Sequence, residues 1–139
     1  MPAKKKTWTD KLNEPKKSQV KLIDKDFADI PAGSRMFIAT PSIIEEYIKQ
    51  IEPGNRVDLK TLRKDLAIEH KADSTCPVTT GIFLRIVAEA NYEKLQAGDK
   101  LEKLAPFWRA IDPKSPLAKK LSFGSEFLDE QISKEKQQK

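Results

Sequence analysis

The sequence predicts a mainly α-helical domain with a small β element. Apolar residues recur every three or four positions in several segments after residue 40, which is the pattern of helices that lie on a core. A short run of bulky residues precedes the first of these segments, and clusters of turn residues separate them. With 139 residues the chain is long enough for one such domain. We expect it to span residues 31–132, between an N-terminal arm (1–30) and a tail (133–139).

The composition favours a protein of a reducing compartment with an anionic partner. The formal net charge is +5 and the pI is about 9.2, which suits an anion-binding face but also a merely solvated basic surface. A single cysteine excludes an internal disulfide, and one Cys with one His does not make a metal-ligand set. No apolar run approaches the roughly 20 residues of a membrane span, and no signal peptide is recognisable. We therefore expect a cytoplasmic protein without a metal or other cofactor.

Residues 1–30 have the composition of a basic, partly mobile arm. They are rich in lysine, are interrupted by Pro15, and hold few apolar residues at regular spacing. Trp8 and Leu12 are the exception, because a short helical turn lets both pack onto the body. We prefer this tethering role for Trp8 over stacking on a ligand. Candidates for a short additional strand are Val20, Leu22 and Ile23.

The first well-defined elements are a strand and a helix. The bulky run Arg35–Ala39 lies between a turn and a helix start, which predicts a strand. Thr40 is a suitable cap for the helix, and Pro41 suits its first position because the donor that a proline lacks would be unpaired there. The helix is expected to end at Pro53–Asn55. Its apolar face comprises Ile43, Ile44, Tyr47, Ile48 and Ile51.

Two further helices follow. The first begins at the cap Asp58, and the segment His70–Asp73 ends it. Ser74 or Thr75 caps the second, which runs to about Leu95. Two helices joined by a tight turn, the second opening on small polar residues, are typical of a helix-turn-helix. The apolar stripes comprise Leu59, Leu62 and Leu66 in the first helix and Ile82, Phe83, Ile86, Val87 and Ala90 in the second.

The chain after the turn at Gly98-Asp99 supplies the rest of the fold. We expect Leu104–Ile111 to be a strand or loop that forms a wing, which makes the fold class a winged helix-turn-helix. Ser115–Leu117 begins a short helix, and a last apolar stripe lies between Phe123 and Ile132. No stripe remains in residues 133–139, which are expected to fray.

The helix that begins near Thr75 is the candidate DNA-reading element. A helix N-terminus carries unpaired backbone donors and a partial positive charge, so it can lie against a phosphate or in a groove. Short hydroxyl side chains there either contact DNA or merely cap the helix, and nearby basic residues supply salt-dependent attraction. The combination of hydroxyls, charge and two helices favours DNA. The candidate contacts are Lys60, Arg63, Lys64, Lys71, Ser74, Thr75, Thr79, Thr80, Arg85 and Arg109.

From Ile51 onward the chain resembles the DNA-binding domain of the methylated-DNA-protein-cysteine methyltransferases, the alkylguanine alkyltransferases. Residues 51–57, Ile-Glu-Pro-Gly-Asn-Arg-Val, resemble the family's Pro-x-Gly-x-Val entry into the helix-turn-helix. Val78–Gly81 stands where the family has the Arg-Ala-Val-Gly start of its recognition helix. Pro106–Ile111 resembles the Pro-Cys-His-Arg-Val-Ile active-site motif, and Leu121–Gly124 is similar to the glycine-rich closing loop. The resemblance implies a winged helix-turn-helix that binds DNA.

The departures from this family concern its catalytic groups. The resemblance implies that a cysteine thiolate beside a histidine accepts an alkyl group from a flipped guanine, and Phe107 and Trp108 occupy these two positions. Val78 and, approximately, Leu59 replace the arginine and the tyrosine that extrude the base. The pattern is similar to that of the alkyltransferase-like proteins, which recognise alkylated bases without repairing them. Those proteins keep the arginine and the tyrosine, however.

Two sets of residues remain open to other roles. Cys76, at a predicted helix N-terminus, is the weak candidate for a nucleophile, but we favour a small buried cysteine. Pro106, Phe107 and Trp108 either wall a pocket for a base or pack under the last helix, and packing is the commoner outcome.

The sequence therefore predicts a protein that binds DNA without covalent catalysis. A protein-interaction module on the same scaffold, with a protein in place of DNA as its partner, is the first alternative. An alkyl-accepting repair enzyme that uses Cys76 is the second.

Overall fold

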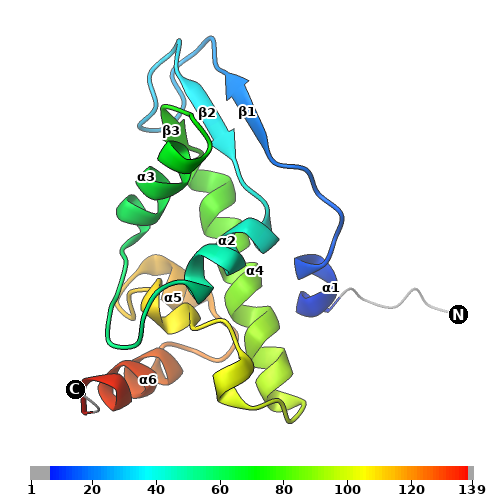
Figure 1. Ribbon diagram of the computed structural model, residues 1–139, viewed down its shortest axis with the longest axis vertical. Coiled ribbons are helices and arrows are strands. Elements are labelled where there is room, and N and C mark those ends of the chain that lie inside the picture. Colours follow the sequence, from blue (N-terminus) through cyan, green and yellow to red (C-terminus); the bar gives the residue numbers. More distant parts are fainter. Residues whose placement is uncertain (1–6, 138–139) are drawn as a thin grey trace, which may run out of the picture.

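The computed structural model describes residues 7–137. It is mainly helical with a three-stranded sheet at one end (Figure 1), which confirms the predicted class of a helical domain with a small β element. In chain order the elements are α1 (Trp8–Leu12), β1 (Gln19–Leu22), β2 (Arg35–Ile38), α2 (Pro41–Lys49), α3 (Leu59–Glu69), β3 (Ser74–Thr75), α4 (Pro77–Gln96), the 3-10 helices η1 (Leu101–Lys103) and η2 (Phe107–Arg109), α5 (Pro116–Lys120) and α6 (Glu126–Gln137).

The sheet joins the N-terminal segment to the helices. Its order is β1-β2-β3, with β1 antiparallel and β3 parallel to β2. Phe37 of β2 pairs in register with Val20 on one side and Thr75 on the other. The sequence does not predict β3, because two residues are too few for a strand pattern, and Ser74 and Thr75 have the chemistry of helix caps. The residue in the cap position of α4 is Cys76.

Two helices begin where their cap residues predict. Thr40 Oγ1 accepts a hydrogen bond of 3.2 Å from the backbone of Ile43, and Pro41 occupies the first turn of α2. Asp58 Oδ1 accepts one of 2.7 Å from the backbone of Thr61 at the start of α3. Each bond satisfies a donor that has no partner within the helix. The predicted starts of both helices are confirmed.

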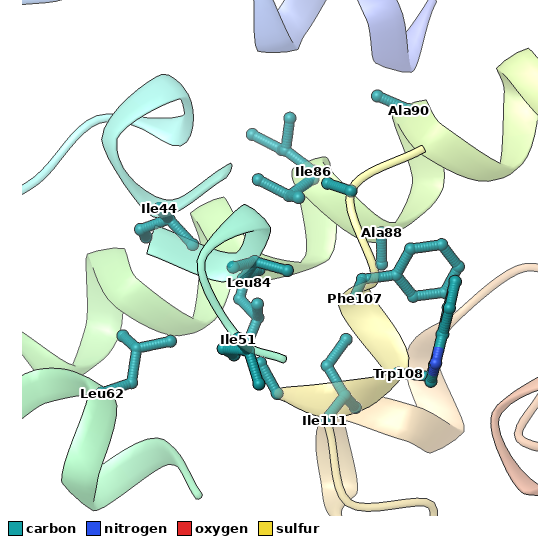
Figure 2. Packing of buried hydrophobic residues seen from close by; sticks show 14 of the residues in the cluster. Ile44, Ile51, Leu62, Leu84, Ile86, Ala88, Ala90, Phe107, Trp108 and Ile111 are labelled. Atoms are coloured by element: carbon teal, nitrogen blue, oxygen red, sulfur yellow. The ribbon is translucent and has the colours of Figure 1, made fainter. Parts of the chain in front are cut away.

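The long helix α4 is the centre of the molecule. α1, α2 and η2 pack against it (Figure 1). From Leu84 to Asn91 every residue except Arg85 is buried, so this part of the helix is covered nearly all round. Figure 2 shows the side chains of α2, α4 and η2 that meet in this core, with Ala88 facing the ring of Phe107.

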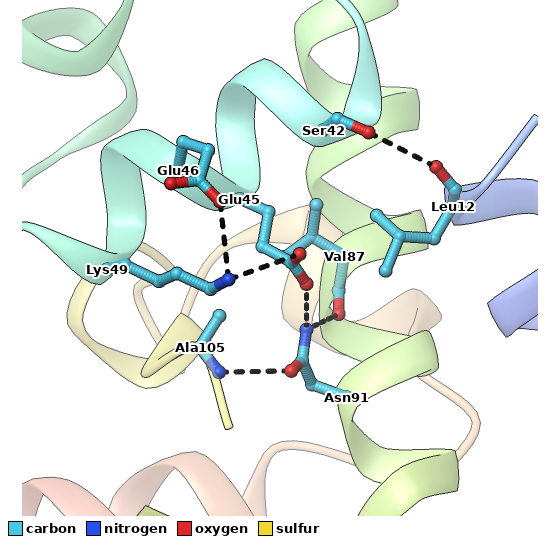
Figure 3. Close-up of polar contacts among 8 residues, drawn as sticks. All are labelled: Leu12, Ser42, Glu45, Glu46, Lys49, Val87, Asn91 and Ala105. Atoms are coloured by element: carbon cyan, nitrogen blue, oxygen red, sulfur yellow. Dashed lines mark hydrogen bonds and ion pairs between the residues drawn. The ribbon is translucent and has the colours of Figure 1, made fainter. Parts of the chain in front are cut away.

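Asn91, which is buried in this core, ties three segments together (Figure 3). Its amide nitrogen donates to Glu45 Oε2 of α2 at 2.9 Å and to the carbonyl of Val87 at 2.8 Å. Its side-chain oxygen accepts from the backbone N–H of Ala105 at 3.0 Å. Because a buried amide is costly when unpaired, these bonds fix α2 and the segment before η2 against α4.

The segment predicted to form a wing is buried instead. Residues 104–108 are all buried, and η2 places Phe107 and Trp108 against α6. Their ring centroids lie 5.6 and 6.2 Å from that of Phe127. The structure does not confirm a wing for this segment, because its aromatic side chains are removed from water by packing under the last helix.

The tail predicted to fray is part of a helix that closes the molecule. α6 continues through residues 133–137, and Glu135 Oε2 accepts hydrogen bonds of 2.7 Å from both Trp108 Nε1 and Arg109 Nη2. Arg109 Nη1 also donates to the carbonyl of Ile51 at 2.7 Å. Burial raises the pKa of Glu135, but the hydrogen bonds that its carboxylate accepts, including those from Trp108 and Arg109, outweigh burial and hold the pKa below its usual value. The frayed-tail prediction is wrong for residues 133–137, because the anchor is one polar side chain rather than an apolar stripe, and residues 138–139 lie outside the described residues.

Several side chains of residues 7–30 pack on the body, whereas the composition predicts a mobile arm, and residues 13–18 between α1 and β1 are mainly exposed. Leu12 and Ile30 are only 2% and 1% exposed. The predicted helical turn at Trp8 and the predicted strand are confirmed as α1 and β1. Sequence composition is misleading here because single anchoring residues, rather than a periodic stripe, hold the segment. The remainder of the predicted arm, residues 1–6, lies outside the described residues.

Replacing Glu135 with alanine should lower the free energy of unfolding by about 3 kcal/mol, because Trp108 and Arg109 lose their shared acceptor in a largely buried site. Urea unfolding followed by circular dichroism measures this change. Glu130→Ala is the control on the same helix, where the side chain is 59% exposed, and should cost less than about 0.5 kcal/mol. Equal effects of the two substitutions would contradict the anchoring role of Glu135.

Candidate nucleic-acid interface

The N-terminal half of α4 leaves one side of the helix uncovered. Val78 and Ile82 are 53% and 52% exposed, although both are large and apolar. Because they are four residues apart they share one side of the helix, and Arg85 continues it. The space beside Gly81 is open as well, since a Cβ there would have no heavy atom within 4 Å. The two side chains form a short apolar strip on the surface of the helix.

A hollow of about 610 Å³ adjoins this side of the helix, and we call it the α1–α5 hollow because α1, α4 and α5 line it. Its charged lining residues are all cations, namely Lys11, Arg85 and Lys120. An apolar surface with cations and without carboxylates suits an anion that carries an apolar part. The other lining residues are Trp8, Val78, Gly81, Ile82, Ile86 and Leu117.

A second hollow, of about 450 Å³, shares Leu117 with the first. We call it the α3–α5 hollow, because it lies between the start of α3, α5 and the chain after η2. It is mainly apolar, and its volume is within the range of small-molecule sites. The two hollows and the uncovered side of α4 together form what we call the α4 face. The α3–α5 hollow is lined by Arg56, Val57, Asp58, Leu59, Leu84, Ala110, Ile111, Asp112, Ser115, Pro116 and Leu117.

Glu93 of α4 fixes α1 beside this face. Its carboxylate accepts hydrogen bonds from the backbone of Trp8 at 3.1 Å, the backbone of Thr9 at 3.0 Å and the hydroxyl of Thr9 at 2.9 Å. Burial raises the pKa of Glu93, but the three bonds outweigh burial and hold the pKa below its usual value. In the next turn of α1, Lys11 Nζ lies 4.2 Å from the centre of the Trp8 ring. α1 thereby brings both a cation and an aromatic ring to the α4 face.

Two of the predicted DNA contacts, Arg63 and Thr75, serve the fold instead. Arg63 Nε donates to the carbonyl of Thr75 at 2.9 Å, and its two terminal nitrogens donate to Asp29 at 2.8 and 2.9 Å. The hydroxyl of Thr75, which is fully buried, donates to the carbonyl of Arg63 at 2.7 Å. The polar atoms of both residues are thus occupied by partners within the fold, namely each other's backbone and Asp29. Ser74 is half-buried beside Arg63, at 3.5 Å from its guanidinium.

The remaining predicted hydroxyls and Arg109 also have positions inside the fold. Thr80 is fully buried and donates to the carbonyl of Cys76 at 2.6 Å, so the alternative of a purely structural hydroxyl is confirmed for it. The hydroxyl of Thr79 is buried too, and it has no hydrogen-bond partner among the described residues. Arg109 is bound to Glu135, which makes its predicted contact with DNA wrong in this structure.

The predicted base pocket is not formed by Pro106, Phe107 and Trp108 together, because Pro106 and Trp108 line a hollow of about 550 Å³ that Phe107 does not line. All three residues are buried, and the alternative of packing under the last helix is confirmed. Cys76 is 3% exposed and packs with a small cluster that includes Ile30, which confirms a buried cysteine.

The predicted cations at the surface are Lys60, Lys64 and Lys71, which are exposed, and Arg85 on the α4 face. Sequence reasoning missed the residues that make this face. The apolar pattern of the predicted helix places Ile82 in the core. Helical spacing shows which residues share a side of the helix, but it does not show whether another segment covers that side. The sequence gives little indication of Lys11 and Lys120. Each lies at or near the end of a short helix that packs on the body through a buried apolar residue.

No protein-family model, curated protein sequence or solved structure matches the chain. Within residues 7–137, no helix has the length and apolar character needed to cross a bilayer. The same part of the chain holds no group of three or more side chains able to bind a metal ion.

Acid should release α1 from α4. Folding lowers the pKa of Glu93. The stabilisation that its carboxylate provides is therefore complete above the unfolded-state pKa of about 4.3, and it is lost as the pH falls through the lower pKa of the folded state. The indole N–H signal of Trp8 in NMR spectra should therefore move below about pH 4. Glu93→Gln should produce the moved signal already at neutral pH, whereas Asp99→Asn, an exposed control just after α4, should not. A Trp8 signal that stays in place in both cases would refute the role of Glu93.

Proposed function

We propose that the chain is a DNA-binding protein on a winged helix-turn-helix scaffold of the alkyltransferase-like kind, and that it does not transfer alkyl groups. The α4 face carries this proposal, because exposed Val78 and Ile82 lie beside three cations of the α1–α5 hollow. The order of α3 and α4 supports it too, since the second helix of a helix-turn-helix is the one that enters a groove of DNA.

In this proposal the two parts of the surface have different tasks. The methyl groups of Val78 and Ile82 contact thymine methyl groups or sugars in the groove. Exposed lysines such as Lys60 and Lys64 on α3 lie against phosphates, and their attraction weakens as salt rises. Most of the affinity then comes from charge, and the apolar side of α4 contributes position and preference.

The absence of alkyl transfer follows from the residues at the family's catalytic positions. Phe107 and Trp108 have no nucleophilic atom, and both are buried. Cys76, the second alternative, is 3% exposed among apolar side chains, where an alkylated base has no access to the sulfur without local unfolding.

Recognition of an alkylated base is the finer part of the proposal, and the α3–α5 hollow is its candidate site. Leu59, which stands approximately where the family has its base-rotating tyrosine, lines this hollow together with Ala110 and Ile111. Its volume of about 450 Å³ and its largely apolar lining suit an extruded base whose alkyl group needs an apolar contact.

Two matched duplexes, one with and one without an O6-alkylated guanine, test this finer part by fluorescence anisotropy. We expect salt-sensitive binding to both and tighter binding to the alkylated duplex. Mass spectrometry of the recovered protein should show no added alkyl group on Cys76. Equal affinities would restrict the function to general DNA binding, and a mass increase on Cys76 would support the repair enzyme instead.

A protein-interaction module remains the second candidate, because exposed Val78 and Ile82 would also suit the apolar side of a partner protein. Capture of partners with and without nuclease treatment separates the two functions. Partners that persist after nuclease treatment, together with no binding to duplex DNA, would favour the protein partner.

Replacing Ile82 with glutamate should weaken binding to duplex DNA by at least about tenfold, because it places a negative charge on the α4 face against the phosphates. Ile82 is 52% exposed, so the fold should tolerate the change. Leu22→Glu is the matched control, since Leu22 is 70% exposed on β1 and lines neither hollow. The same anisotropy measurement compares the three proteins. A loss of affinity that is equal for both variants would contradict the placement of DNA on the α4 face.

A further inference from the structure

The α1–α5 hollow receives cations from segments outside the helix-turn-helix. Lys11 comes from α1 and Lys120 from α5, and both line the hollow beside α4. Within residues 7–137 neither lysine takes part in an ion pair. Two unpaired ammonium groups on separate segments, next to one apolar surface, point to an anionic ligand between them.

Arg85 adds charge to the hollow but is poorly placed as a direct ligand. Its Nε atom is buried, has no hydrogen-bond acceptor within residues 7–137, and lies 3.6 Å from a carboxylate oxygen of Glu89. Since Glu89 is 1% exposed, its charge offsets much of the charge of Arg85. The direct contacts to an anion therefore fall to the two lysines.

Trp8 shapes the hollow and does not offer an open stacking surface. Lys11 Nζ and Arg85 Cζ lie 4.2 and 5.1 Å from the centre of its ring, where a stacked base would otherwise lie. The rest of the apolar lining is aliphatic, with Val78, Ile82, Ile86 and Leu117. Such a surface suits the sugar of a nucleic-acid backbone better than a base.

We propose that the α1–α5 hollow binds a phosphodiester of the DNA strand that continues past α4, with Lys11 and Lys120 as its phosphate contacts. The sugar of the same nucleotide lies on the aliphatic lining. This inference rests on the proposed DNA-binding function and extends it, because it makes α1 part of the DNA-binding surface. Glu93 is a positioning residue in this arrangement, since its bonds to Trp8 and Thr9 hold the helix that carries Lys11.

The salt dependence of DNA binding measures each such contact. The slope of log K against log salt concentration is about −0.9 for each phosphate neutralised on duplex DNA, so one lost contact should reduce its magnitude by about 1. A surface cation that does not touch DNA changes this slope little. The slope therefore distinguishes a phosphate contact from a general change in affinity.

Fluorescence anisotropy of the full chain with a labelled duplex, between about 50 and 200 mM salt, is the experiment. Lys11→Ala and Lys120→Ala should each reduce the slope by about 1, and the double variant by about 2. Lys11→Gln keeps most of the stem that covers Trp8 and should act like Lys11→Ala. Glu93→Gln should do the same, since it frees α1. The control Lys103→Ala removes an exposed lysine that lines neither hollow and should leave the slope unchanged.

Three outcomes would overturn the inference, and they differ in what they say about the proposed function. Salt-sensitive binding with unchanged slopes in the Lys11 and Lys120 variants, shown to be folded by circular dichroism, removes the inference alone. No salt-sensitive binding by the unmodified protein removes both. Inorganic phosphate at constant ionic strength tests the source of the anion. If phosphate binds to the unmodified protein but not to the double variant, and it leaves the DNA affinity of both proteins unchanged, the hollow binds free phosphate rather than a strand.

Discussion

Three polar side chains on α4 hold the other segments of the molecule in place. Glu89, Asn91 and Glu93 are spaced two residues apart, so each points about 200° around the helix from the one before. Glu89 accepts hydrogen bonds from the backbone and the hydroxyl of Ser122, Asn91 binds α2 and the segment before η2, and Glu93 binds the start of α1. Buried amide and carboxylate groups are costly when unpaired. Each segment that packs on α4 therefore supplies hydrogen-bond partners to the α4 side chain that holds it.

The position of these three residues decides which part of α4 stays accessible. They lie in its C-terminal half, so the covering segments gather there and the outer side of the N-terminal half remains open at Val78 and Ile82. α1 and α5 nevertheless reach the edge of the open part, where they supply Lys11 and Lys120. The α4 face is thus a consequence of how the core is closed, and the same hydrogen bonds that stabilise the fold determine where its cations lie.

Interactions within one helical turn make helix starts predictable from the sequence, whereas contacts between residues far apart in the sequence determine the candidate site. The capping residues Thr40 and Asp58 act within one turn, so the starts of α2 and α3 are readable from the sequence. The bond between Trp8 and Glu93 joins residues 85 positions apart and leaves no local pattern, so the sequence predicts the helical turn at Trp8 but not its partner on α4. For the same reason Glu135, in a segment without an apolar stripe, gives no sign that it binds Trp108 and Arg109.

The candidate site was predictable in its location and not in its residues. The sequence places it at the start of the helix after β3, and the α4 face does begin there. Small hydroxyl side chains such as Thr75 and Thr80 are short enough to be buried against the backbone, so they are poor markers of a contact surface. Arg109 belongs to the motif that resembles the alkyltransferase active site, yet here it pairs with Glu135 of the last helix.

Whether DNA lies on the α4 face is tested most directly by NMR, with the 15N-labelled protein titrated with a short duplex at low salt. The amide signals of Val78, Ile82, Lys11 and Lys120 should move together and saturate with one affinity. Signals of η1, which follows the C-terminal end of α4 and lines neither hollow, should stay in place. Movement confined to η1, or no movement at all, would contradict the assignment of the α4 face as the DNA-binding surface.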